Sequence, residues 1–232
     1  MLVLGIESAT AQVGVAIGGH EGVLASAHSA RDRRHAESLT PQIEFVCSQA
    51  RVELSEIGVV AVDVGPGLFT GLRVGIATAM AVAYGLGVPM IGVSSLDLGA
   101  FAVEHSRRLI VPCYDARRGE VFTANYRSVP GGVQRLSDPV VCTPDELLAS
   151  LMAKSEDVLM LGDGAQRHRE VFSSISHVEF AGTSLQYPSA RSLVDLAHPK
   201  ALREEFVLPS EIEPLYLRLP DAEINWKTRD GR

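Results

Sequence analysis

The fold of this chain is decided by the stretch Gly58-Val-Val-Ala-Val-Asp-Val-Gly65-Pro-Gly-Leu-Phe-Thr-Gly71-Leu-Arg-Val-Gly75. An apolar, mostly β-branched run ends in a glycine-rich turn, and a long helix of small residues is expected to follow. This order brings backbone N–H groups close to a ligand or to another chain. The turn matches no common phosphate loop: Leu72 and Arg73 stand where the Walker pattern requires Lys and Ser or Thr, and Thr70 replaces a glycine of the dinucleotide fingerprint. The stretch therefore predicts that a ligand or another chain approaches the backbone of this turn closely, and it leaves open which of the two.

The composition fits a globular chain of one large domain or two small ones, with 232 residues of which 46% are apolar. The formal net charge of −7 disfavours a stand-alone nucleic-acid binder, because phosphate binding requires a basic surface. Residues 1–7 are predicted to form a buried strand rather than a signal peptide, and we expect no membrane span. Three cysteines without a paired spacing favour a reducing, cytoplasmic setting: Cys47, Cys113 and Cys142.

The two halves of the chain repeat one order of elements, strand-strand-strand-helix-strand-helix. Apolar alternation predicts the strands, and three- and four-residue spacing predicts the helices. Pro41 lies early in the first helix, which Thr40 is expected to cap. In the first half we expect strands at 2–8, 13–17, 23–29, 57–64 and 90–93 and helices at 39–50 and 69–86. In the second half we expect strands at 109–114, 120–126, 134–141, 157–161 and 177–181 and helices from 143, at 165–174 and at 189–197.

This repetition predicts an α/β fold of two ribonuclease-H-like lobes, each with a mixed sheet, as in the actin, Hsp70 and sugar-kinase superfamily. A meander that continues into a parallel strand–helix–strand unit is the arrangement of each such lobe. We expect an N-terminal lobe for dimerisation at residues 1–102 and a C-terminal lobe with an extended tail at 103–232. Fold analogy alone does not decide function.

Polar side chains at two expected turns are candidates for contact with nucleotide phosphates or with a partner. Ser8 and Thr10 lie at the first hairpin, where this superfamily grips ATP phosphates. Asp115, Arg117 and Arg118 open the second lobe, and an arginine can hold a phosphate or a carboxylate through two hydrogen bonds. A charged hairpin that pairs internally is the alternative. No histidine pair shares a helix face and no nucleophile motif occurs, so neither a metal site nor a catalytic residue is predicted.

The helix expected at 69–86 carries apolar residues on more than one face. One face can cover a sheet, and the other requires cover from the second lobe or from another subunit. Its alanines allow a second helix to approach closely. We therefore predict a subunit interface on this helix and the one before it, with a purely internal core as the alternative: Leu39, Ile43, Val46, Cys47, Ile76, Ala77 and Met80.

Five motifs together resemble the TsaB (YeaZ) family: Gly65 to Gly75, Arg34-His-Ala-Glu-Ser-Leu39, Asp115-Ala-Arg-Arg-Gly-Glu-Val121, Gly162-Asp-Gly164 and Pro214-Leu-Tyr-Leu-Arg218. The resemblance covers nearly the whole chain. It implies a place in the bacterial synthesis of threonylcarbamoyladenosine next to the tRNA anticodon. The family motif in the glycine turn comprises Gly65, Pro66, Gly67, Phe69, Thr70, Gly71, Arg73 and Gly75.

A comparison with TsaD, the catalytic paralogue in that family, implies which member this chain resembles. TsaD binds its metal through a His-x-x-x-His element just after the fifth strand, where Ser95 and Gly99 stand here. A hydroxyl and a glycine cannot replace two imidazoles. TsaD opens its second lobe with a Ser-Gly-Gly-His phosphate turn, where this chain has Tyr114-Asp-Ala-Arg117. Glu7 also departs from the aspartate usual in the first strand, which counts against phosphate binding by the first lobe.

The resemblance therefore implies a non-catalytic dimerisation subunit that activates a TsaD-like subunit, with a TsaE-like ATPase as a further partner. It implies that the first-lobe helices pair with those of TsaD or, without TsaD, with a second copy of this chain. The glycine turn is expected to approach that neighbouring subunit, with Arg73 at the rim or in an inter-subunit ion pair. The chain alone is expected to bind no cofactor, with ATP or ADP only at the interface of the complex, and to meet tRNA only through the complex.

Two other functions remain open from the residues alone. A stand-alone ATP-binding protein or metal-dependent hydrolase of the same fold would show ATP turnover or stoichiometric metal. A direct tRNA-binding module could use a local basic patch, although the net charge of −7 opposes it. The residues of that patch would be Arg31, Arg33 and Arg34.

Overall fold

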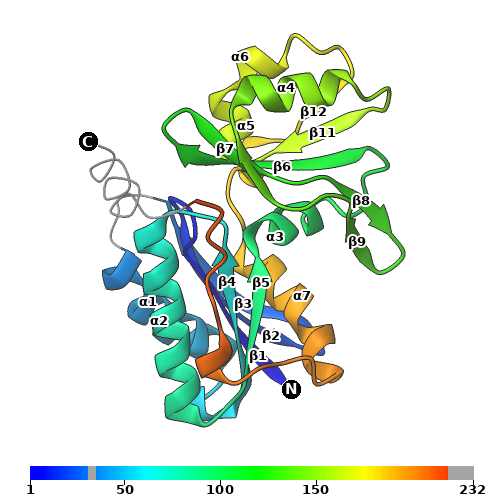
Figure 1. Ribbon diagram of the computed structural model, residues 1–232. Helices are drawn as coiled ribbons and strands as arrows, with labels where there is room; N and C mark the ends of the chain where they lie inside the picture. Colours follow the sequence, from blue (N-terminus) through cyan, green and yellow to red (C-terminus); the bar gives the residue numbers. More distant parts are fainter. Residues whose placement is uncertain (31–34, 219–232) are drawn as a thin grey trace, which may run out of the picture.

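The computed structural model describes residues 1–30 and 35–218 and contains two α/β lobes, one above the other in Figure 1. The first part of the chain forms β1 (Leu2–Glu7), β2 (Val13–Gly19), β3 (Gly22–Ser29), α1 (His35–Ala50), η1 (Leu54–Glu56), β4 (Ile57–Gly65), α2 (Phe69–Leu86), β5 (Met90–Ser94) and α3 (Ser95–Phe101). The second part forms β6 (Leu109–Arg117), β7 (Glu120–Thr123), β8 (Tyr126–Val129), β9 (Gly132–Arg135), β10 (Val140–Cys142), α4 (Pro144–Met152), β11 (Val158–Leu161), α5 (Asp163–Arg167), α6 (Arg169–Phe172), β12 (Val178–Phe180), η2 (Thr183–Leu185), α7 (Ala190–Leu202) and η3 (Pro209–Glu211).

Both sheets have the same mixed topology. In the first sheet the order is β3-β2-β1-β4-β5, with antiparallel pairs up to β1 and parallel pairs from β1 to β5. The second sheet repeats this as β10-β7-β6-β11-β12. Tight turns can join the antiparallel strands, whereas parallel neighbours require crossovers such as α2. The repeated order confirms the predicted pair of ribonuclease-H-like lobes.

The second lobe contains a hairpin that the sequence analysis did not predict. The strands expected at 120–126 and 134–141 each divide in two, and β8 pairs with β9 between β7 and β10. The strand expected at 120–126 is divided because its two parts pair with different parts of β6. The C-terminal part of β6 pairs with β7, and Ile110 pairs with β8. At the break, the Asn125 N–H donates to Ser137 Oγ at 2.9 Å. The helix expected at 165–174 is likewise divided into α5 and α6, with His168 between them.

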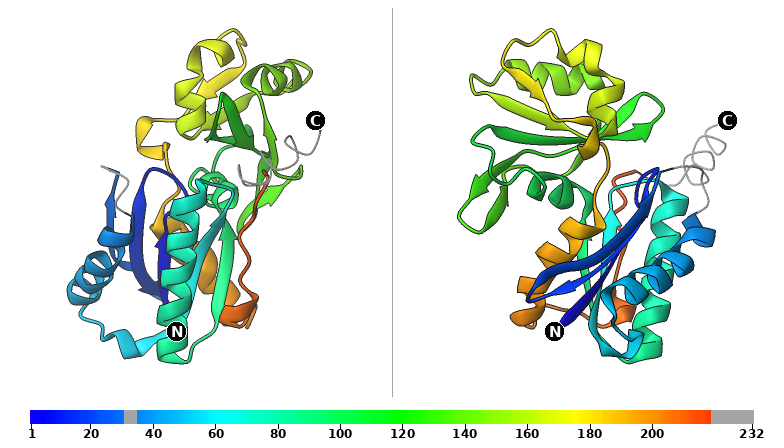
Figure 2. Two further views of the ribbon diagram at one scale, coloured as in Figure 1. Left: turned by 60° about the vertical axis from the view of Figure 1, so that its left-hand side comes forward. Right: turned by 180° about the vertical axis from the view of Figure 1, so that it is seen from behind.

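α7 returns from the second lobe to the first. Helices α1 and α2 cover one face of the first sheet, and α7 covers the opposite face (Figures 1 and 2). Leu193 and Val194 of α7 are buried in one cluster with Val3 and Ala16 of the sheet. The predicted boundary at residue 102 is thereby corrected. Part of the range 103–232 completes the first lobe, because an apolar sheet face must be covered.

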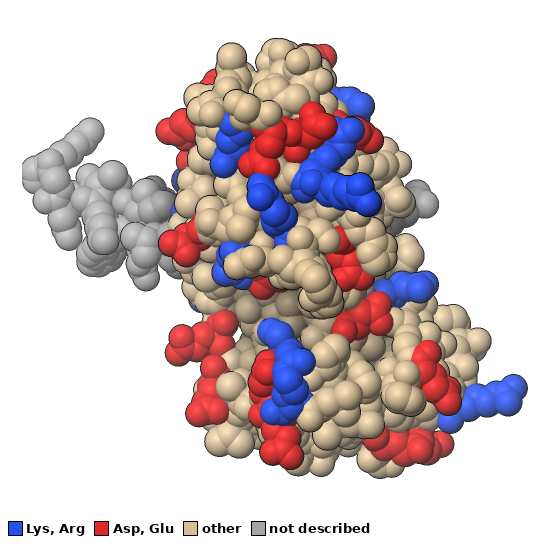
Figure 3. All heavy atoms as spheres, turned by 90° about the vertical axis from the view of Figure 1, so that its right-hand side faces the viewer, with Lys and Arg blue, Asp and Glu red and all other residues tan. Residues whose placement is uncertain are grey.

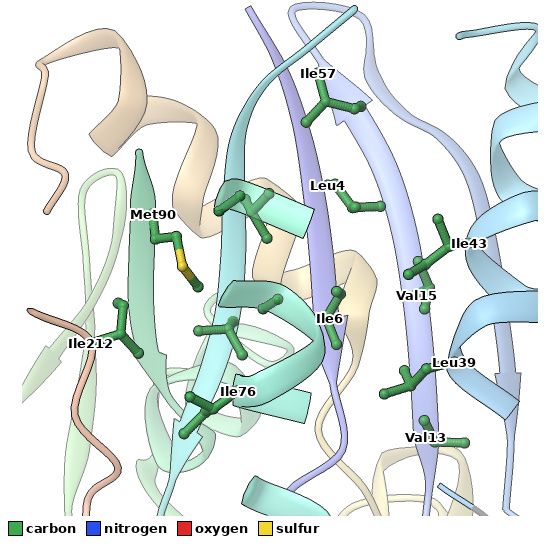
Figure 4. Packing of buried hydrophobic residues seen from close by; sticks show 14 of the residues in the cluster. Leu4, Ile6, Val13, Val15, Leu39, Ile43, Ile57, Ile76, Met90 and Ile212 are labelled. Atoms are coloured by element: carbon green, nitrogen blue, oxygen red, sulfur yellow. The ribbon is translucent and has the colours of Figure 1, made fainter. Parts of the chain in front are cut away.

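The largest core cluster lies between the first sheet and helices α1 and α2. Figure 4 shows Leu39 and Ile43 of α1, and Ile76 of α2, among side chains of the sheet such as Ile6 and Val15. These helix residues form the buried stripe that covers the sheet. Their assignment to a subunit interface is therefore wrong, because the core of the lobe already contains them. The residues concerned are Leu39, Ile43, Val46 and Ile76, which are at most 7% exposed.

α1 begins earlier than predicted, at His35. Thr40 is consequently inside the helix and does not cap it. Pro41 lies in the second turn, where it has no N–H to donate to the Glu37 carbonyl. The prediction missed the first turn because Ala36 and Glu37 are exposed and add nothing to the buried stripe.

After α7 the chain runs back along the first lobe, as the prediction of an extended tail required. We call residues 209–218 the C-terminal strap. Ile212 of the strap joins the largest core cluster. At the end of the strap, Arg218 donates to the Ala116 carbonyl at 3.1 Å and pairs with Glu120, both in the second lobe. The polar end expected at 225–232 lies outside the described residues, as do Arg31, Arg33 and Arg34.

By length and composition alone, α2 could cross a membrane. In this structure it packs as a core helix: Leu72, Ile76 and Ala79 are buried against the first sheet. The first sheet therefore covers one apolar face of α2.

Candidate functional site

The glycine turn packs against the first hairpin of its own chain. A Cβ at position 67 would collide with the Ala9 carbonyl oxygen and would lie 2.8 Å from the Ala9 Cβ. The Leu68 N–H donates to the same carbonyl at 2.7 Å. Gly67 is therefore required by the β1–β2 loop, which occupies the space that any side chain would need.

Ser8 holds the turn from within the core. Its hydroxyl donates to the Gly71 carbonyl at 2.8 Å, and a Cβ at position 75 would collide with Ser8 Oγ. Ser8 and Thr10 are only 3% and 4% exposed. One prediction is corrected here: the close approach of Gly67 is to the hairpin of the same chain rather than to a neighbouring subunit. The contact of Ser8 and Thr10 with a phosphate or a partner stays a prediction, and both side chains are buried.

Two carboxyl groups are buried side by side at the ends of β1 and β4, which are parallel neighbours. Asp63 Oδ1 accepts hydrogen bonds from Ser95 Oγ at 2.6 Å and from the Gly65 N–H at 2.7 Å. Glu7 Oε1 accepts from the Ala9 N–H at 2.9 Å. Burial raises the pKa of Asp63 to about 7. Burial and then the neighbouring Asp63 raise the pKa of Glu7 well above its ordinary range.

Tyr114 of β6 fills the space beside α3. Ser95 and Gly99 are one turn apart on the same face of α3. A Cβ at position 99 would lie 3.2 Å from Tyr114 Cζ and would collide with its hydroxyl oxygen. The tyrosine is 1% exposed, and burial followed by the charge of Asp63 raises its pKa. The ring therefore stands where any side chain at position 99 would have to lie.

The polar side chains at the joint between the lobes are withdrawn from the surface. Ser8, Thr10, Glu7 and Asp63 are at most 4% exposed, and Tyr114 lies against α3. Among the described residues, three buried oxygens here have no hydrogen-bond partner: Glu7 Oε2, Asp63 Oδ2 and Tyr114 Oη.

The predicted contact residues of the second lobe are partly engaged with one another. Asp115 Oδ2 accepts from Arg117 Nη1 at 3.1 Å and from Arg167 Nη1 at 3.2 Å. The Asp115 N–H donates to Asp163 Oδ1 at 2.9 Å. Arg117 and Arg118 both have positive φ, 64° and 55°, at the tip of the β6–β7 hairpin. This geometry favours the internally paired hairpin for Arg117.

A second set of polar contacts joins α3 to the β8–β9 hairpin. Arg135 Nη2 donates to both carboxylate oxygens of Asp97, at 2.7 and 2.8 Å. The Tyr126 hydroxyl donates to the same carboxylate at 2.8 Å. Figure 3, seen from the side of β8 and β9, shows basic and acidic side chains interspersed on this face. The inserted hairpin thus fixes the second lobe on α3 and does not form a basic surface there.

Among the described residues, only the strap around Tyr216 contacts the N-terminal end of the outward face of α2, and the rest of this face is largely exposed. Of the predicted interface residues, Ala77 is exposed, Met80 is half-buried, and Cys47 lines a groove of about 470 Å³ at the end of α1. Apolar and small side chains dominate this face, and the neighbouring α1 adds Phe45, which is 52% exposed. The exposed residues of α2 include Phe69, Arg73, Ala77, Ala81 and Tyr84.

Sequence reasoning missed three residues that shape these sites. Asp63 carried a signal, because it is the one charged residue in the apolar run that ends at Gly65. Tyr114 and Tyr216 carried none. Their roles depend on Gly99 and on α2, which are distant in the sequence and become neighbours only on folding.

We expect Gly67→Ala to lower the free energy of unfolding by about 1–3 kcal/mol, the range for overpacked sites. The added methyl group would overlap the backbone of Ala9. Gly85→Ala is the matched control in α2, since its Cβ would meet nothing within 4 Å, and it should stabilise by about 0.5–1 kcal/mol. Chemical denaturation of both variants measures this difference. Equal stabilities would show that the turn can move away from the hairpin.

We expect Asp63→Asn to flatten the dependence of stability on pH. The pKa of Asp63 is higher in the folded chain, so its contribution is complete below its ordinary pKa of 3.8 and is lost as the pH rises through about 7. The Asn side chain can still accept both hydrogen bonds. Between pH 5 and pH 8 the free energy of unfolding of the unsubstituted protein should therefore fall by about 2 kcal/mol more than that of the variant.

Thermal denaturation across this pH range provides the measurement. Asp138→Asn, at an exposed position in the second lobe, is the control. Parallel stability curves for Asp63→Asn and the unsubstituted protein would show that the buried carboxyl does not take up a proton in this range.

Similarity to known proteins covers nearly the whole chain. A family model described as TsaD, tRNA N6-adenosine threonylcarbamoyltransferase, matches residues 23–226. The tRNA threonylcarbamoyladenosine biosynthesis protein TsaB of Bacillus subtilis is 28% identical, over 97% of this chain and 98% of its own length. TsaB of Escherichia coli is 28% identical over the whole of both chains. The solved structure of YeaZ from Pseudomonas aeruginosa superposes with a TM-score of 0.82 at 25% identity, over 93% of this chain and 99% of that chain. The chain therefore belongs to the TsaD family and, within it, to the TsaB (YeaZ) proteins of tRNA threonylcarbamoyladenosine biosynthesis.

Proposed function

We propose that this chain is a non-catalytic dimerisation subunit that pairs with a TsaD-like catalytic subunit and activates it. The observation that carries the proposal is the packing of Tyr114 against Gly99. TsaD holds its metal through a pair of histidines, and this chain has Ser95 and Gly99 in their places. Because the tyrosine ring fills the space beside α3, a second imidazole has no room. The lobe pair keeps the scaffold without the metal-binding side chains.

The outward face of α2 is the surface through which we propose that the chain pairs. Ala77 and Ala81 allow close approach of a helix, and the larger Phe69 and Tyr84 flank them. An exposed apolar face of this kind favours contact with a subunit. Without TsaD the same face would join two copies of this chain about a two-fold axis.

The remaining parts of the proposal concern the complex as a whole. A TsaE-like ATPase joins the two subunits, and tRNA is met through the complex in the cytoplasm. Since Ser8 and Thr10 are buried, we propose that ATP or ADP binds at an interface between subunits. The charge of −7 supports indirect contact with tRNA.

The rival function, a stand-alone ATP-binding protein or metal-dependent hydrolase, has weaker support. Among the described residues there is no group of three or more His, Cys, Asp or Glu side chains that could hold a metal ion. Stoichiometric metal in the purified chain, or ATP turnover by the chain alone, would favour the rival. Salt-sensitive binding of tRNA by the isolated chain would favour a direct tRNA-binding role.

We expect Ala77→Glu, and likewise Met80→Glu, to abolish pairing with the TsaD-like subunit while the chain stays folded. A carboxylate on this face would be desolvated on association, and the longer side chain would hold the partner helix away. Ala149→Glu is the matched control, because Ala149 is exposed on α4 in the second lobe. Size-exclusion chromatography of the mixed subunits gives the readout, and circular dichroism checks the fold. Normal complex formation by the α2 variants would place the interface elsewhere.

A further inference from the structure

We propose that Arg73, stacked on the ring of Phe69 and hydrogen-bonded to Tyr216, is the docking determinant that receives a carboxylate of the protein partner. This inference rests on the proposed function and names the group that the outward face of α2 recognises. It also gives the C-terminal strap a part in the interface, because Tyr216 belongs to the strap.

The arginine is fixed by three contacts. Its guanidinium carbon lies 3.8 Å from the ring centroid of Phe69 and 5.8 Å from that of Tyr216. Arg73 Nε donates to the Tyr216 hydroxyl oxygen at 2.9 Å. The two ring centroids are 5.5 Å apart with an interplanar angle of 33°. A guanidinium that is stacked and hydrogen-bonded in this way loses little freedom when it binds a further group.

No carboxylate of the described residues neutralises the charge of Arg73. Within the described part of the chain Arg73 has no carboxylate partner, whereas Arg117 is paired with Asp115 and Arg135 with Asp97. Since Nε is engaged with Tyr216, the two Nη groups remain to donate in parallel. Two parallel N–H donors match the oxygens of one carboxylate.

The surroundings favour a protein carboxylate over a phosphate group. Phe69 and Tyr216 are 40% and 39% exposed, so they present apolar ring surface around a single cation. The same helix face continues through Ala77 toward Tyr84. Aromatic residues and arginine are the side chains most often found at the energetic centre of protein interfaces. The occupant that fits is an Asp or Glu flanked by apolar side chains.

The strap determines where Tyr216 lies. The Leu215 N–H donates to the Val64 carbonyl at 2.7 Å, which places the preceding residue of the strap beside β4. Arg218, two residues after the tyrosine, is bonded to the second lobe. The site is therefore assembled from α2 and the strap, and the strap ties it to the second lobe.

The test is the affinity of the complete chain for its TsaD-like subunit, measured by titration at low and at high salt. Arg73→Gln should weaken binding about tenfold or more at low salt, the loss typical of a centrally placed arginine. The loss should shrink at high salt, since screening weakens the pair in the unsubstituted complex. Arg73→Lys keeps the charge without the planar guanidinium. Its affinity at low salt should lie between that of the unsubstituted chain and that of Arg73→Gln.

Two further variants separate the effect of the orientation of Arg73 on binding from the effect of losing a positive charge. Tyr216→Phe keeps the ring and removes the hydroxyl that holds Nε, so binding should weaken less than with Arg73→Gln. Arg107→Gln is the control for loss of an exposed arginine outside α2 and the strap, and it should leave the affinity unchanged. Circular dichroism of each variant confirms that the fold is retained.

Three results would overturn the inference. Unchanged affinity of Arg73→Gln, together with loss of pairing in Ala77→Glu, would leave the proposed function standing without this determinant. A defect of Arg73→Gln seen only when ATP is present would assign the arginine to a phosphate. Normal pairing by Ala77→Glu would remove the proposed function itself, and the inference with it.

Discussion

The packing of a side-chain-free backbone turn onto the first hairpin is the constraint on which the rest of this structure depends. Gly67 lies on the Ala9 backbone, and Ser8 reaches under the turn to the Gly71 carbonyl. These contacts fix the start of α2 over the ends of β1 and β4. The position of this start sets which face of α2 is buried and which is exposed. It also sets the surroundings of the carboxyl groups of Glu7 and Asp63.

Polar groups are packed into the joint between the lobes. Glu7 and Asp63 lie where the parallel strands end, but no cation lies among the described residues around them, and burial favours their protonated forms. Tyr114 fills the space beside Gly99. The joint between the lobes is therefore packed with buried groups rather than open to solvent.

The relation between the lobes is set by contacts remote from the glycine turn. α3 lies between the sheets, with Leu98 in a cluster of the first lobe and Leu96 in a cluster of the second. The Asp97–Arg135 pair and the C-terminal strap add two further connections. The exposed face of α2 is consequently presented on a body whose two halves are held together at several points. A fixed surface loses less entropy when a partner binds.

The sequence by itself determined the order of elements in the first lobe, the two-lobed fold and the family, because apolar periodicity and glycine spacing are local properties of the chain. It did not predict the β8–β9 hairpin of the second lobe. It also located the candidate surface on α2, although it assigned core residues such as Leu39 and Ile76 to that surface. Only the tertiary structure decided that the glycine turn approaches its own hairpin, that α7 returns to the first lobe and that Tyr114 occupies the cleft. Periodicity shows that a residue is apolar on a given face of its helix. Which partner covers that face depends on segments far away in the sequence, and only folding brings those segments together.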